Sequence, residues 1–248
     1  MKSTQRFSDR VSNYVKYRPS YPANLIETLK TECNLSKGSC IADIGSGTGK
    51  LSELFLPDEF CVYAVEPNKE MREAAETLFK IDNNFRSVAG ESSKTTLADN
   101  SVDLVTVAQA FHWFDPFEAK KEFKRILKPG GHIALIWNNR NTSSPFQEDY
   151  DQILTRHAPD YAKSSHRNIS DKEIADFFFP QICREFSFTY SQKFDLQGFL
   201  GRMNSASYTP KPDTKEHLEL RKSAKRLYNK YEKNNMIEFS YVTKLYLV

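Results

Sequence analysis

The chain is poor in glycine and cysteine and has no long apolar run. Its 248 residues include nine glycines and four cysteines. The longest apolar segments, such as residues 133–137, fall far short of the roughly 18 residues of a membrane helix. The cysteines show neither CxxC spacing nor clustering with histidine, which argues against a zinc site or a disulfide framework. We therefore expect free thiols, no bound metal and no membrane span.

The chain also lacks a large excess of either charge. Its 35 Lys and Arg nearly balance its 32 Asp and Glu, which leaves a net charge of +3. This balance gives no reason to expect a nucleic-acid or membrane partner. Residues 1–22 lack the apolar block of a secretory signal, so we expect a cytoplasmic protein. We also expect a monomer or homodimer. The apolar share of 39% is that of a globular chain.

Three of the nine glycines stand together, at Gly45, Gly47 and Gly49. A short apolar run at 40–44 precedes them, and residues 51–56 follow with helical apolar spacing. The pattern predicts a strand, a glycine loop and a helix. Glycine suits such a loop because a Cβ would obstruct a sharp turn that brings backbone N–H groups against a ligand.

A second apolar run, residues 61–65, ends in Glu66, which lies 21 positions after Gly45. A carboxylate at the end of a second parallel strand can accept hydrogen bonds from both hydroxyls of a ribose. The spacing therefore indicates nucleoside binding.

Other nucleotide loops fit less well. A phosphate-binding P-loop needs glycine where the chain has Ile44 and Ser or Thr where it has Leu51. A dinucleotide loop needs glycine at Lys50, which weakens that interpretation without excluding it. No tyrosine has lysine four positions later, as a short-chain reductase requires. A nucleoside without phosphate at the loop remains the best candidate.

The loop at 43–49 (DIGSGTG) resembles the signature of class I S-adenosylmethionine-dependent methyltransferases. Further matches follow in order at Glu66, at 67–71, at Gly90 and Glu91, at 100–107 and at 125–131. The resemblance implies S-adenosyl-L-methionine as cofactor, with Glu66 on the ribose and the 67–71 and 90–91 segments near the adenine. A finer resemblance, to the methyltransferase type 11 branch with trans-aconitate methyltransferase-like proteins, rests on residues 14–19, 110–114 and 241–246.

The apolar runs predict an α/β doubly wound sheet. Strands are expected near 40–44, 61–65, 84–88, 102–107, 132–137, 186–190 and 239–247. The resemblance implies a Rossmann-like methyltransferase sheet of order 3-2-1-4-5-7-6 with the last strand antiparallel. One domain is expected over 1–248, with attachments at 1–30, 141–180 and 198–235 that cover the site on the acceptor side.

The resemblance and the expected edge of the sheet assign cofactor contacts to the following residues: Tyr14, Arg18, Asp43, Gly45, Ser46, Gly47, Glu66, Pro67, Met71, Gly90, Glu91, Gln109, Ala110 and Trp113. Tyr17, Trp137, Arg140 and Arg202 are the candidates for contact with the methyl acceptor. The expected partner is a small molecule that accepts a methyl group on a carboxylate or hydroxyl oxygen.

The acceptor type decides which residues matter. A carboxylate is already ionised at neutral pH and needs no base, so an arginine clamp from Arg18, Arg140 or Arg202 would serve it best. A hydroxyl acceptor needs a base, for which His112 is the candidate, although His112 could equally pack the pocket. Two alternatives stay open: an NAD(P)-dependent oxidoreductase, and a non-catalytic protein that binds the cofactor on the same fold.

Overall fold

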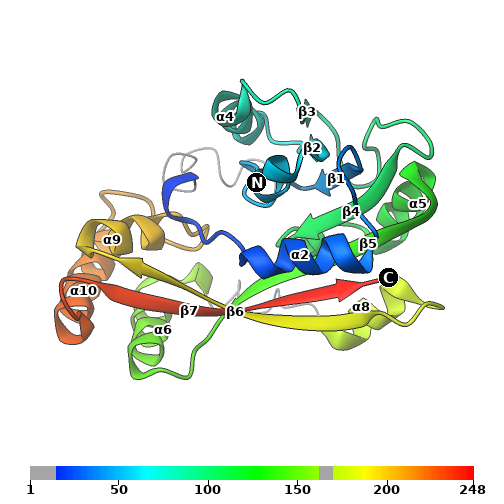
Figure 1. Cartoon of the computed structure of the whole chain (residues 1–248). Helices are drawn as coiled ribbons and strands as arrows, with labels where there is room; N and C mark the ends of the chain where they lie inside the picture. Colours follow the sequence, from blue (N-terminus) through cyan, green and yellow to red (C-terminus); the bar gives the residue numbers. More distant parts are fainter. Residues whose placement is uncertain (1–14, 162–169) are drawn as a thin grey trace.

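The computed structural model describes residues 15–161 and 170–248. Its centre is a seven-stranded sheet of order β3-β2-β1-β4-β5-β7-β6 (Figure 1). The strands are β1 (Cys40–Ile44), β2 (Cys61–Val65), β3 (Phe85–Val88), β4 (Val102–Ala108), β5 (Leu127–Arg140), β6 (Arg184–Phe194) and β7 (Ile237–Leu247). The strand order predicted from the sequence is confirmed.

β7 is the antiparallel strand of the sheet. It pairs antiparallel with β5 and β6, while β3, β2, β1, β4 and β5 pair in parallel. The last three strands are longer than predicted. β5 starts at Leu127 because the register with β4 shifts between Val102 and Leu104, so that residues expected as a turn join the strand. β6 and β7 extend because they pair with each other along their full length.

Helices cover both faces of the sheet, as apolar strands in a parallel sheet require. On one face α2 (Ala23–Glu32) and α3 (Ser52–Phe55), followed by η3 (Leu56–Asp58), pack on β1, β2 and β4. On the other face α5 (Pro116–Ile126) and α8 (Asp171–Phe178) pack against the same strands and β5. α4 (Lys69–Phe79) follows β2.

A third cluster lies beyond the sheet. It is formed by α6 (Pro145–His157), α9 (Leu196–Asn204), α10 (Lys215–Tyr231) and the paired ends of β6 and β7. Figure 1 shows these helices gathered at one end of the molecule. Its centre is aromatic, with Phe146, Tyr150, Phe199 and Phe239 in mutual ring contact at 5.0–6.2 Å. We call this unit the cap.

Helix starts follow local sequence signals. Asn68 accepts a hydrogen bond from Met71 N at the start of α4, and Asp115 and Ser144 do the same for α5 and α6, each followed by proline. Within the described residues, no helix has the length and apolar character needed to span a membrane.

Candidate active site

The glycine loop leaves β1 as predicted and turns back over β2. Gly45, Gly47 and Gly49 all have positive φ, at 71°, 59° and 80°, which glycine adopts without strain. Gly45 N and Ser46 N both donate to Val65 O, at 2.8 and 3.2 Å. A Cβ on Gly45 would lie 2.6 Å from Ala110 Cβ. The loop is therefore held in a conformation that only glycine permits, close to the segment after β4.

Glu66 closes the loop from the end of β2. Its carboxylate accepts hydrogen bonds from Gly47 N at 3.0 Å and Asn68 N at 2.8 Å. The residue is 8% exposed, and burial raises the pKa of its carboxyl, while the two backbone N–H groups act in the opposite direction. Each oxygen keeps further lone pairs for a ligand, so the geometry fits the predicted ribose contact.

Asp43 lies beneath the loop. Its carboxylate accepts from Ser52 Oγ at 2.7 Å and Thr106 Oγ1 at 3.2 Å, and the residue is only 1% exposed. Burial raises its pKa to about 6, against the two hydroxyl hydrogen bonds. The structure thus places Asp43 as a support that joins the helix after the loop to β4.

The turn after β3 reaches the same edge. A Cβ on Gly90 would lie 3.0 Å from Val65 Cγ1, and Glu91 closes a small bridge with Lys94. Glu91 is exposed, whereas Met71 on α4 is 4% exposed. The backbone carbonyls of Glu66 and Pro67 accept from Arg72 Nη1 at 2.8 and 2.9 Å, which fixes the chain between β2 and α4.

The segment after β4 lies at the same edge, close to Gly45. We call this segment, the glycine loop, Glu66 and the turn after β3 together the cofactor pocket. Gln109 has a positive φ of 58°, a strained value for a residue other than glycine, and its Nε2 donates to Asn138 O at 3.0 Å. Ala110 is buried, and η4 (Phe111–Trp113) follows it. His112 and Trp113 are partly exposed, with ring centroids 4.7 Å apart.

The N-terminal segment that carries Tyr17 and Arg18 joins the sheet and the cap. Asn138 Nδ2 donates to Ser20 O at 2.8 Å, and the Tyr17 ring lies directly against Gly201 of α9, where a Cβ would clash. Arg18 is partly buried beside them. Tyr14 lies outside the described residues.

Arg140 stands at the end of β5, beyond the pocket and inside the cap. Its side chain is 14% exposed and pairs with Asp151 through Nη2. The same nitrogen donates to Tyr161 OH at 2.7 Å, and the guanidinium lies 4.9 Å from the centre of the Tyr150 ring. Nη1 is buried and has no hydrogen-bond partner within residues 15–161 and 170–248.

Arg202 of α9 is a second buried guanidinium in the same region. The residue is 7% exposed, and its Nε donates to Tyr241 OH at 3.3 Å. Among the described residues no carboxylate lies within 4.0 Å of it. Tyr150 and Tyr208 interact electrostatically with both guanidiniums, so the two arginines belong to one cluster of side chains. We call this cluster the acceptor chamber, after the role proposed for it below.

Sequence reasoning missed the tyrosines of this chamber. Tyr150 is 2% exposed, and its hydroxyl has no hydrogen-bond partner in the described part of the chain. Tyr161, Tyr208 and Tyr241 come from three other segments, so no local motif marks them. Trp137, predicted near the acceptor, lies in the core below α5 and α8, with its ring 6.4 Å from Phe111 and 5.9 Å from Tyr246.

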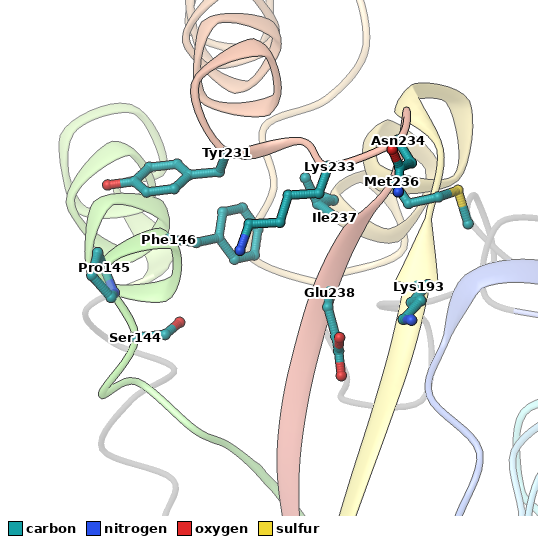
Figure 2. A pocket seen from close by; sticks show the side chains of 10 residues that line it. All are labelled: Ser144, Pro145, Phe146, Lys193, Tyr231, Lys233, Asn234, Met236, Ile237 and Glu238. Carbon is teal, nitrogen blue, oxygen red and sulfur yellow. The ribbon is translucent and has the colours of Figure 1, made fainter.

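A separate cavity of about 550 Å³ opens between α6, α10 and the ends of β6 and β7. Figure 2 shows Lys233 extending across it toward Phe146, with Met236 at its rim. None of the predicted cofactor or acceptor residues lines it. Its lining includes none of the arginines and tyrosines of the acceptor chamber.

Comparison with known proteins identifies the family of this chain. Residues 42–135 match the family described as methyltransferase domain. An uncharacterized methyltransferase of Schizosaccharomyces pombe is 31% identical over 97% of this chain and 95% of its own length. A second protein of that yeast, named an uncharacterized methyltransferase-like protein, is 32% identical over 96% and 92%.

Among solved structures, a protein of Anaeromyxobacter dehalogenans described as a type II methyltransferase superimposes with a TM-score of 0.65. It covers 93% of this chain and 97% of its own at 18% identity, and so supports the fold. The chain belongs to the class I S-adenosylmethionine-dependent methyltransferases.

Proposed function

We propose that this methyltransferase transfers the methyl group to a carboxylate oxygen of a small molecule. The observation that carries this proposal is the pair of buried guanidiniums, Arg140 and Arg202, around the acceptor chamber. Asp151 balances one of the two positive charges, and no carboxylate among the described residues balances the other. A buried charge is costly unless it is paired, so a bound monoanion would complete the chamber.

The polar groups of the chamber that lack a hydrogen-bond partner among the described residues can all donate a hydrogen bond. Arg140 Nη1 and the hydroxyl of Tyr150 are buried without partners in the described part of the chain, and a guanidinium cannot accept a hydrogen bond. A ligand rich in acceptor atoms therefore suits the chamber better than an amine. The two parallel N–H groups of a guanidinium match a carboxylate.

The residues assigned to the cofactor bind and orient it. We assign the ribose hydroxyls to Glu66 and close backbone approach to Gly45, Ser46 and Gly47, with Asp43 holding the loop from below. Bound S-adenosylmethionine supplies an electrophilic methyl group on a sulfonium. We assign Gln109, Ala110 and Trp113, which follow β4, to the cofactor as well, where they exclude water.

The remaining contacts of this proposal are secondary. Pro67, Met71, Gly90 and Glu91 are assigned to the adenine side, and Tyr17 and Arg18 to the junction of the two sites. The resemblance of residues 110–114 and 241–246 to trans-aconitate methyltransferase-like proteins supports an acid as acceptor. We assign α6, α9 and α10 to the acceptor side of one methyltransferase domain.

A hydroxyl acceptor is the second candidate. It is favoured by the place of His112, on η4 directly after β4 and partly exposed, where a neutral imidazole could accept the hydroxyl proton. His112→Asn is then expected to abolish turnover of an alcohol and leave binding of S-adenosylhomocysteine unchanged. Unchanged turnover of that alcohol would remove His112 as a base.

The test of the main proposal is an acceptor screen. Purified protein with S-adenosylmethionine is incubated with small carboxylic acids, their methyl esters and the matching alcohols, and formation of S-adenosylhomocysteine and of methyl esters is measured. We expect turnover of one or more acids and none of the esters. Turnover of alcohols alone would contradict the carboxylate assignment.

Arg202→Met sharpens the screen. Loss of one charge-assisted hydrogen bond predicts a fall in kcat/KM of about 30-fold, from about 2 kcal/mol, with unchanged affinity for S-adenosylhomocysteine. Arg184→Met is the matched control, since Arg184 is an exposed arginine of β6 that pairs with Glu32. Equal effects of the two substitutions would argue against a role for Arg202 in acceptor binding.

A further inference from the structure

Two cysteines stand side by side at the amino ends of β1 and β2, opposite the cofactor site. Cys40 begins β1, Cys61 begins β2, and the two are direct register partners in the parallel pairing. Neighbouring strands lie about 4.8 Å apart, and disulfides span Cα separations of about 4.4–6.8 Å. Register partners also project their side chains to the same face of a sheet.

The two thiols lie near each other and are reachable. Cys61 interacts electrostatically with Cys40, Cys40 Sγ donates to Gly38 O at 3.9 Å, and both residues are partly exposed. Burial, and then the neighbouring Cys61, raise the pKa of Cys40, while Lys128 acts in the opposite direction. Lys128 is held there by Asp103, whose carboxylate also accepts from Cys40 N at 2.7 Å.

The other two cysteines lack this arrangement. Cys33 follows α2, is 8% exposed, and has its pKa raised to about 12 by burial. Cys183 precedes β6 and is not a register partner of another cysteine. Because the thiolate is the reactive form, Cys33 is a poor nucleophile, and neither residue has a thiol partner in the described part of the chain.

We propose that Cys40 and Cys61 form an oxidative modification site, in which a peroxide converts the two thiols into a disulfide between β1 and β2. One thiolate attacks the peroxide, which releases water and leaves a sulfenic acid. The second thiol then displaces a second water and forms the S–S bond. Overall, the two thiols lose two electrons and two protons, and hydrogen peroxide becomes two molecules of water.

The bond would tie together the two strands that carry the cofactor loop and Glu66. Cys40 lies five residues before Gly45, and Cys61 lies five residues before Glu66. A disulfide here joins two residues that are already neighbours in the folded protein. It is therefore expected to stabilise the fold by restricting the unfolded chain. It leaves the carboxyl ends of the strands, where the cofactor binds, unmodified.

The experiment uses the full chain with Cys33→Ser and Cys183→Ser, which leaves Cys40 and Cys61 as the two thiols. Hydrogen peroxide is added at pH 8.5, and free thiols, intact mass and tryptic peptides are measured. We expect both thiols to disappear, the mass of the monomer to fall by about 2 Da from loss of two hydrogens, and one peptide pair to link positions 40 and 61. The thermal midpoint of the oxidised protein is expected to rise by roughly 5 °C.

A third substitution, Cys40→Ser in the same background, is the control. It is expected to yield sulfinic acid at Cys61 with a mass increase and no linked peptide. The proposal is overturned if oxidation of the two-thiol protein leaves both thiols free, adds oxygen to each of them, or joins two chains instead. A lower thermal midpoint in the linked protein would overturn the stabilising role.

Discussion

The cofactor pocket and the acceptor chamber are built in different ways. The pocket uses backbone N–H groups and one carboxylate from two neighbouring strands, as in the hydrogen bond of Gly47 N to Glu66. The chamber uses guanidiniums and phenols from segments that are far apart in the sequence, such as Arg140 and Tyr241, which pairing of β5 with β7 brings together. Loop geometry therefore fixes the first site, and packing of the cap fixes the second.

This difference predicts two kinds of failure. Changes in the pocket are expected to weaken binding of S-adenosylhomocysteine. Changes in the chamber are expected to lower turnover and leave that binding intact. The following substitutions test this separation, beginning with the one of largest expected effect.

Glu66→Ala is expected to weaken binding of S-adenosylhomocysteine by at least about 100-fold. The change removes hydrogen bonds to a charged group, each worth about 1.5–3 kcal/mol, and also releases Gly47 N and Asn68 N. Calorimetric titration measures the effect, and Glu76→Ala on the exposed face of α4 is the control. Near-normal binding with lost turnover would contradict a role of Glu66 in holding the cofactor.

Gly45→Ala is expected to weaken the same binding by about 30-fold. Its Cβ would lie 2.6 Å from Ala110 Cβ and would also sit at a φ of 71°, which costs an L residue about 1–2 kcal/mol. Gly130→Ala separates the two causes, because Gly130 has a φ of 79° and open space around it. We expect the control to lose stability alone; if both variants bind equally well, the close approach to Ala110 is unimportant.

Asp43→Asn is expected to change how stability depends on pH. The pKa of Asp43 is about 6 in the folded protein, against 3.8 for the ordinary group. The folded state therefore holds this proton more tightly, and the associated stability, present below about pH 4, is lost as pH rises through 6. Between pH 5 and 7.5 the wild type should lose about 1.4 kcal/mol that the variant keeps.

Urea unfolding at both pH values measures this difference. Asp176→Asn, at an exposed position of α8, is the control and is expected to follow the wild type. A wild type and an Asp43→Asn variant with parallel pH profiles would show that Asp43 does not titrate in this range.

Tyr150→Phe is expected to have the smallest effect. It should raise the stability of the fold and lower the activity. It removes a buried hydroxyl that has no partner among the described residues, so the fold should gain about 1 kcal/mol. Acceptor kcat/KM should fall about fivefold if the hydroxyl contacts the acceptor. Tyr241→Phe removes the acceptor of the Arg202 hydrogen bond and should instead lower stability. Thermal unfolding and initial rates distinguish the two variants.

The sheet could be predicted because its signals are local. Apolar runs marked β1, β2 and β4 within a residue of their observed ends, and glycine and acid mark where β1 and β2 stop. The start of β5 was missed because the register shift between Val102 and Leu104 depends on pairing across the sheet. The full lengths of β6 and β7 also depend on pairing, which periodicity within one strand does not reveal.

The same distinction applies to the sites. The loop glycines and Glu66 are spaced at a fixed distance in the sequence, and the structure brings them together as expected. Arg140 and Arg202 were candidates because of their expected place at the edge, but the two tyrosines that they share, Tyr150 and Tyr208, come near them only when the cap folds. Trp137 packs in the core with Phe111 and Tyr246, and its contact with the acceptor stays a prediction, since an aromatic residue at the end of an apolar run serves the core equally well.

β7 belongs to both regions at once. Its end at Leu245 and Leu247 is buried in the main sheet, while Phe239 and Tyr241 near its start are buried in the cap. A rigid-body swing of the whole cap would therefore have to break strand pairing. Entry of the acceptor and release of the product must instead proceed through local displacement of side chains and helices, so the rate of product release should depend on α9 and the Tyr17 contact beside it.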